Sequence, residues 1–146
     1  MDVGHMLRIA HSVSEKVHTV NHSTSVEEAA KKIAEKRIGA LPVLKDGHLV
    51  GIISERDIAT KLVAQGLNPK NTKVSQIMTP NPTIVFPSYD LEVCLDLMER
   101  GHFRHLPVID DYKLIGMISI RDILVALHKE KDDLLIHFEN YIFANR

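Results

Sequence analysis

Apolar and polar positions follow two different periods along this chain, and the same succession of periods occurs twice. Apolar residues spaced three and four apart predict amphipathic helices, whereas short runs of Val, Ile and Leu predict strands. Ser25 followed by Glu28 is a typical start of a helix, and Asp46-Gly47 is typical of a hairpin turn. The elements predicted for the first copy are an extended segment at 17–20, a helix at 25–39, strands at 41–44 and 49–53, and a helix from Ser54 to Gly66.

The second copy follows the first at a constant distance. Leu-Pro-Val at 41–43 recurs at 106–108, 65 residues later, and between Ile38 and Ile58 11 of 21 positions are identical to their counterparts at that distance. The corresponding elements of the second copy are an extended segment at 83–86 and a helix at 91–101. Its turn, Asp111-Tyr112, lacks the glycine, so we predict a turn of another type. The predicted fold class is α/β with mixed sheets, made of two tandem β-α-β-β-α repeats.

The repeat also sets the expected division of the chain. Because a unit of about 60 residues buries only about 60% of its surface, we expect the two copies to share one core. The predicted regions are a first repeat with an N-terminal segment at 1–66, a linker at 67–82, a second repeat at 83–131 and a C-terminal helix at 132–146. The last region carries an apolar face, which either packs on its own domain or forms a subunit interface. That face is made of Leu134, Leu135, Phe138, Tyr141 and Ile142.

Composition narrows the class of protein. With 146 residues the chain has the length of a single domain, and its one cysteine excludes an internal disulfide framework. The net charge of −1 gives no sign of a nucleic-acid or anionic-membrane surface. The start of the sequence lacks a signal-peptide pattern, and no apolar run is long enough to span a bilayer. We therefore expect a cytoplasmic protein.

The repeated Gly-x-x-Ser-x-x-Asp is the motif that carries chemistry. Ser54 and Asp57 in the first copy, like Ser119 and Asp122 in the second, stand where a strand leads into a helix. The N-terminus of a helix favours an anion, and a carboxylate accepts two hydrogen bonds from the cis-diol of a ribose. Serine followed three residues later by an acid is also a simple helix cap. The residues alone leave both interpretations open.

Leu-Pro-Val, a turn and then Gly-h-h-Ser-x-Arg-Asp (h is apolar), all twice, resemble a tandem pair of cystathionine-β-synthase (CBS) domains, the Bateman module. The resemblance covers about residues 15–128. It implies a pseudo-twofold pair with two clefts that bind adenosine-containing ligands, which are AMP, ADP or ATP and in some members S-adenosylmethionine or a dinucleotide such as NAD. It also implies a homodimer that regulates a partner protein and catalyses no reaction. The alternative function is a structural dimerisation scaffold without a ligand, while an enzyme acting on nucleotides lacks a recognisable base, nucleophile or metal set.

The resemblance also implies which residues bind the ligands. The cleft of Asp122 is expected to contain Ser119, Met117, Arg104, His105, His18 and Ile38. The cleft of Asp57 is expected to contain Ser54, Ile52, Thr83 and Phe103. Copy two has Arg104-His105 before Leu-Pro-Val, where copy one has Gly39-Ala40. A phosphorylated ligand is therefore expected in the Asp122 cleft first, unless Lys36 or Arg37 serves the other cleft equally well.

Two other kinds of site are weighed against simpler explanations. The nine histidines include the pairs His18 and His22, and His102 and His105, but no cysteine or carboxylate cluster completes a metal site. Cys94 lies on the apolar side of a predicted helix, which favours a core position over a nucleophile. We expect no metal and no catalytic residue.

Overall fold

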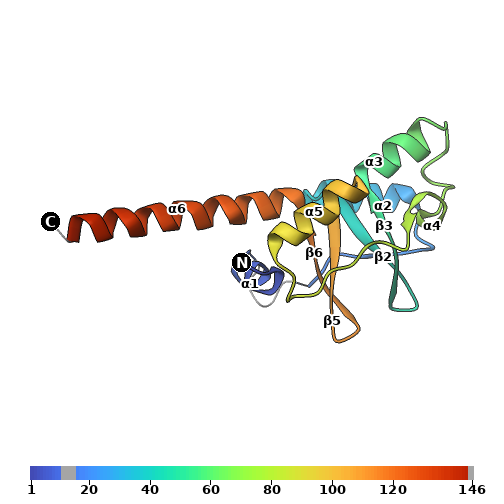
Figure 1. Cartoon of the computed structure of the whole chain (residues 1–146). Coiled ribbons are helices and arrows are strands. Elements are labelled where there is room, and N and C mark those ends of the chain that lie inside the picture. Colours follow the sequence, from blue (N-terminus) through green and yellow to red (C-terminus); the bar gives the residue numbers. More distant parts are fainter. Residues whose placement is uncertain (11–15, 145–146) are drawn as a thin grey trace.

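The computed structural model describes residues 1–10 and 16–144, and in it each repeat folds around a core of its own. The elements of the first repeat are β1 (Val20–Asn21), α2 (Val26–Lys36), β2 (Ala40–Lys45), β3 (His48–Ser54), α3 (Glu55–Asp57) and the π-helical turn η1 (Ile58–Val63). Those of the second are α5 (Leu91–Gly101), β5 (His105–Asp110), β6 (Lys113–Ser119) and α6 (Ile120–Ala144). Three further elements are α1 (Val3–Ala10), α4 (Val74–Ile77) and β4 (Thr79–Pro80). Figure 1 shows the hairpins β2–β3 and β5–β6 extending in the same direction.

The sheets are mixed, as the sequence predicts. In the first repeat the strand order is β1-β2-β3-β4, with β1 parallel to β2 and the other pairs antiparallel. In the second repeat β5 pairs with β6, and Val85 forms a parallel bridge with Val108. Val20 pairs with Val43 in the same way. The fold is therefore the predicted α/β arrangement of two β-α-β-β-α repeats.

The two hairpin turns are of the same kind, so the prediction of a different second turn is wrong. Asp46 and Gly47 have φ of 50° and 78°, and Asp111 and Tyr112 have φ of 48° and 62°. Two positive φ values at the centre of a two-residue loop match the twist of the flanking strands. The twist of the strands therefore decides the turn, although a positive φ is strained for a tyrosine. Tyr112 adopts it at a position where the residue is 98% exposed.

The expectation of one shared core is also wrong, and the reason lies in short flanking helices. Val74 and Ile77 of α4 are buried in the core of the first repeat, and Val3 and Met6 of α1 are buried in that of the second. Each repeat therefore gains apolar residues from a helix that lies outside the predicted β-α-β-β-α unit. Residues 67–82, predicted as a linker, contain α4 and β4, and the N-terminal segment grouped with the first repeat packs on the second.

The backbone hydrogen bonds show that α1 and α4 dock in equivalent ways. The Val3 N–H donates to the Tyr89 carbonyl at 2.9 Å, and the Val74 N–H donates to that of Thr24 at 2.8 Å. Two further pairs of bonds match. Gly4 N–H donates to Pro87 O as Ser75 N–H donates to His22 O, and Leu91 N–H donates to Met1 O as Val26 N–H donates to Thr72 O. The isolated bridges Asp2–Asp90 and Lys73–Ser25 match as well. Residues 1–4 thus take the same places on the second repeat that residues 72–75 take on the first.

Helix α6 runs without a break from Ile120 to Ala144, past the predicted boundary at 132, and extends away from the body of the molecule (Figure 1). Its first turns pack on the second core through Ile120, Ile123 and Leu127, whereas every residue over 129–144 is exposed. The predicted apolar face therefore does not pack on its own domain. In the described part of the chain, no helix is long and apolar enough to cross a membrane.

Candidate functional site

A cavity of about 1110 Å³ lies between the two repeats and receives residues from both. Binding sites for small ligands usually measure about 300–1,000 Å³, so the cavity has room for a nucleotide. All seven residues predicted for the Asp122 cleft line it: His18 and Ile38 from the first repeat, and Arg104, His105, Met117, Ser119 and Asp122 from the second. The structure thus brings these seven residues together.

Asp122 stands in the first turn of α6 with one carboxylate oxygen engaged. Oδ2 accepts a hydrogen bond from the Ser119 N–H at 2.9 Å, and Ser119 Oγ accepts one from the Asp122 N–H at 3.1 Å. The side chain is exposed to the cavity, and among the described residues no group is paired with Oδ1. The two interpretations of the motif are therefore compatible here, because the cap uses one oxygen and leaves the other available.

Asp57, at the matching position of the first repeat, is in the opposite situation. The residue is only 6% exposed. Its Oδ2 accepts hydrogen bonds from Ser54 N–H and Ser54 Oγ, both at 3.0 Å. Its Oδ1 accepts from Thr79 Oγ1 at 3.1 Å and is paired with Lys61 Nζ at 2.9 Å. Both oxygens therefore have protein partners.

The other residues predicted for the Asp57 cleft do not line the large cavity. Ile52 is buried in β3, and Thr83 is exposed. Phe103 packs instead over its own helix end, where a Cβ added to Gly101 would lie 1.8 Å from the ring. The two predicted clefts therefore differ. Asp122 lies on a large cavity, whereas protein side chains already occupy both carboxylate oxygens of Asp57.

The cavity is richer in basic residues than the sequence analysis predicted. Besides Arg104 and His105 it is lined by Arg8, Lys16, Arg37 and Arg121, with Glu55 and Asp110 as further acids. Arg37 therefore belongs to the Asp122 side, and Lys36 does not line the cavity. Arg8 comes from α1, a segment for which the sequence predicted no site residue. The backbone hydrogen bonds that dock α1 on the second repeat place Arg8 at the cavity, and they are visible only in the folded structure.

His105 is held at the contact between the repeats. A Cβ added to Gly39 would come 3.1 Å from His105 Nε2, so the absence of a side chain at Gly39 makes room for the imidazole. Burial lowers the pKa of His105 below its usual 6.5, while the nearby Asp122 and Glu55 act in the opposite direction. A neutral imidazole at neutral pH donates one hydrogen bond and accepts another.

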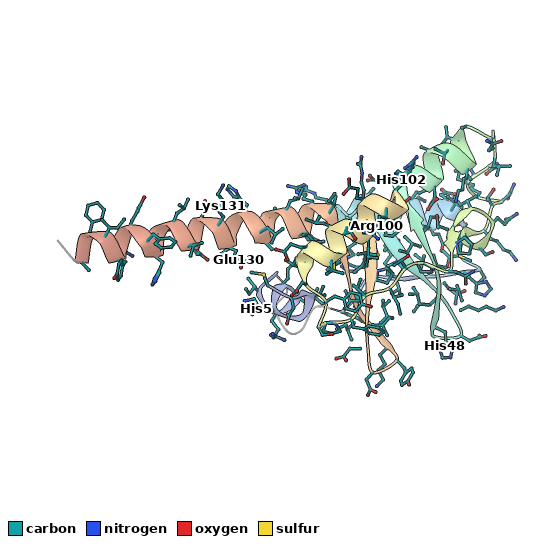
Figure 2. All side chains as sticks on the ribbon, in the orientation of Figure 1. His5, His48, Arg100, His102, Glu130 and Lys131 are labelled. Carbon is teal, nitrogen blue, oxygen red and sulfur yellow. The ribbon has the colours of Figure 1, made fainter. Side chains whose placement is uncertain are left out.

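The remaining candidates take structural places. Cys94 is fully buried in the second core, and this burial, followed by the charge of Asp90, raises its pKa to about 11. The thiol is therefore protonated at neutral pH. Over residues 1–10 and 16–144 no three His, Cys, Asp or Glu side chains are grouped so as to hold a metal ion. Figure 2 places His102 beside Arg100 on the outside of the molecule.

Solved structures share this architecture over most of their length. A putative signal-transduction protein with CBS domains from Burkholderia ambifaria MC40-6 is 39% identical, with a TM-score of 0.83, over 87% of this chain and 93% of that one. The CBS domain pair of protein MJ0100, in complex with 5′-methylthioadenosine and S-adenosyl-L-methionine, is 27% identical with a TM-score of 0.76, over 89% and 98%. CBSX2 in complex with AMP is 32% identical with a TM-score of 0.70, also over 89% and 98%.

Sequence comparison finds the same repeat. The chain spans about a fifth of the length of several curated relatives, such as the CBS domain-containing protein CBSCBSPB2 of Arabidopsis thaliana, which is 37% identical over 106 residues, or 72% of this chain and 20% of that protein. The profile of the CBS domain matches residues 9–64 and again residues 74–129. The chain therefore belongs to the CBS domain family, as a tandem pair of CBS domains.

Proposed function

We propose that this CBS pair is a regulatory module that binds an adenine nucleotide in the cavity between its repeats. The observation that carries the proposal is the convergence of seven predicted binding residues from both repeats on one cavity. Two structural neighbours were solved with adenosine-containing ligands, AMP in one and 5′-methylthioadenosine with S-adenosyl-L-methionine in the other.

Each part of a nucleotide has a counterpart in the cavity. Asp122 Oδ1 accepts a hydrogen bond from a ribose hydroxyl, and Ser119 holds the carboxylate in place. His18 and Ile38 contact the adenine from the first repeat, and Met117 contacts it from the second. The Arg104 guanidinium and the neutral imidazole of His105 each donate to the phosphate, and hydrogen bonds in which donor or acceptor is ionised are about twice as strong as neutral ones.

The net basic lining favours the anionic members of the ligand class. AMP, ADP and ATP carry negative charge, whereas the sulfonium of S-adenosylmethionine is a cation that the arginine side chains repel. A ligand that touches both repeats shifts the protein toward one arrangement only by its difference in affinity between arrangements. In this proposal that shift is the signal to a partner protein, and no bond of the nucleotide is broken.

Calorimetric titration tests the proposal with AMP, ADP, ATP, NAD and S-adenosylmethionine on the whole chain. We expect one adenine nucleotide per chain for the wild type, and Asp122→Ala weakens this binding about tenfold or more, as expected for loss of a hydrogen bond to a charged group. Asp57→Ala changes the same motif outside the cavity and is the control, and thermal unfolding confirms that both variants are folded at the temperature of the titration. Binding lost in Asp57→Ala and retained in Asp122→Ala reverses the assignment. Absence of binding by all five ligands favours the structural scaffold.

We further propose that the module is a homodimer and that α6 takes part in its interface. The side of α6 that packs on the second core through Ile123 and Leu127 continues along the projecting segment as Leu134 and Phe138, each more than half exposed. Figure 2 labels Glu130 and Lys131 on α6, with Glu130 on the side toward α1 in this view. Its own module covers this side only at the base of the helix, so the projecting segment of a second chain is the occupant proposed for the rest of it.

Sedimentation velocity at micromolar concentration tests the dimer. We expect a dimer for the wild type and a monomer for the double variant Leu134→Glu, Phe138→Glu, because two charges at the helix contact cost several kcal/mol of association free energy. Tyr112→Glu, at the exposed hairpin tip, is the matched control and remains dimeric. A wild-type monomer contradicts the dimer, and a dimeric double variant excludes α6 from the interface.

A further inference from the structure

The N-terminal helix α1 forms part of the wall of the cavity. Gly4, Leu7 and Arg8 all line it. The helix is anchored through Val3 and Met6, which are buried in the second core, and its backbone is tied to residues before α5. Arg8 itself is exposed, so its guanidinium is free to contact a ligand in the cavity.

The structural equivalence of α1 and α4 shows how α1 is placed against the second repeat. Met1, Val3 and Gly4 match Thr72, Val74 and Ser75 by their hydrogen bonds. At the same spacing Leu7 corresponds to Met78, the residue that follows α4, but beyond this point the segments differ, because Arg8 still lies in α1 and Thr79 begins β4. The glycines of the two motifs confirm the match: a Cβ at Gly51 would meet Met78 and Thr79, and one at Gly116 would meet Leu7.

Thr79, which follows Met78, contacts the aspartate of the first repeat. Its hydroxyl donates to Asp57 Oδ1, the oxygen that the cap of the first repeat does not use. The second partner of Oδ1 is Lys61, four residues after Asp57. In the second repeat Ala126 stands four residues after Asp122, and it carries no charge. Arg8, on the helix that docks on the second repeat as α4 docks on the first, lines the same cavity as Asp122, whose Oδ1 has no partner among the described residues.

We propose that Arg8 is an anion-binding residue of this cavity, contacting the phosphate attached to the ribose that Asp122 binds. The proposal rests on the proposed function. A guanidinium presents several N–H donors in a planar fork that suits phosphate oxygens. In the first repeat Thr79, the residue after Met78, offers a single hydroxyl donor, and Asp57 already accepts its hydrogen bond. The N-terminal helix thus supplies a specificity residue that distinguishes the two sites.

A pair of ligands separates this role from a purely structural one. AMP and adenosine share the base and ribose and differ in the phosphate, so loss of a phosphate contact affects only AMP. Titration of the whole chain compares wild type, Arg8→Ala and the control Arg100→Ala, an exposed arginine of α5 paired with Asp96 outside the cavity. Thermal unfolding of each variant reports whether α1 remains docked.

We expect Arg8→Ala to weaken AMP binding about tenfold or more, the usual effect of losing a hydrogen bond between charged groups. Its affinity for adenosine and its unfolding temperature stay at the wild-type values, and Arg100→Ala changes neither affinity. Unchanged AMP binding by Arg8→Ala contradicts the role of Arg8 and leaves the proposed function intact. Equal weakening of AMP and adenosine also contradicts it, because it points to a structural role for Arg8. Failure of the wild type to bind either ligand overturns the proposed function together with this proposal.

Discussion

Asp57 and Asp122 share one motif and one backbone position, yet their surroundings differ in nearly every respect. Asp57 is buried, with four hydrogen-bonding or ionic contacts to its two oxygens. Asp122 is exposed on a cavity with one oxygen engaged. The difference does not arise within the motif. It comes from the residue four positions later, Lys61 or Ala126, and from the flanking segment that supplies Thr79 or Arg8. A duplicated motif therefore keeps its capping role in both copies, while neighbouring residues decide which copy retains a free oxygen.

The largest expected effect is on stability. We expect Asp57→Ala to lower the free energy of unfolding by about 2–4 kcal/mol, because it removes a cap and leaves Lys61 and Thr79 without their partner. Asp122→Ala removes only the cap, at a cost of about 1 kcal/mol. Urea unfolding of both variants measures the difference. Equal costs contradict the distinction between a filled and an open site.

A lysine introduced into the second repeat tests whether a partner for Asp122 makes its site resemble that of Asp57. Ala126→Lys places an ammonium four residues after Asp122, as Lys61 stands to Asp57. We expect AMP binding to weaken about two- to fivefold, the magnitude of an exposed ion pair that the ligand must break. Val125→Lys, at a neighbouring exposed position, serves as the control. Identical effects of the two lysines, measured by calorimetry, exclude a specific pair with Asp122.

The smallest expected effect concerns His105 and pH. Burial lowers its pKa in the folded state below the usual 6.5, so the unfolded chain binds a proton more readily. The contribution of this residue to stability is therefore complete above the unfolded pKa and falls as the pH decreases below it. Comparison of urea unfolding at pH 7.5 and 5.5 measures the effect, with a smaller pH dependence in His105→Gln than in the wild type. An equal pH dependence in both proteins contradicts the assignment.

Local patterns predicted the individual elements well because the interactions that form them are local. The serine–acid spacing places Ser25 at the N-cap of α2, where its side chain accepts a hydrogen bond from the Glu28 N–H. Short runs of Val, Ile and Leu predicted the hairpin strands, and the buried side of α5 includes Cys94 as expected. The turn at Asp111-Tyr112 was mispredicted because sheet twist, rather than residue preference, fixes its conformation.

The sequence by itself determined the duplication, the α/β repeat and the set of residues at the Asp122 site. The duplication and the repeat follow from short-range spacing and from the identity of the copies, whereas the residue set follows from the resemblance of the repeated motifs to CBS domain pairs. Only the tertiary structure decided that α1 packs on the second repeat, that Lys61 and Thr79 fill the site at Asp57, and that Arg8 reaches the open cavity. Such contacts join segments far apart in the chain, and helix docking depends on buried apolar surface such as that of Val3 and Met6. The spacing of apolar residues in α1 does not indicate on which of the two similar cores the helix packs.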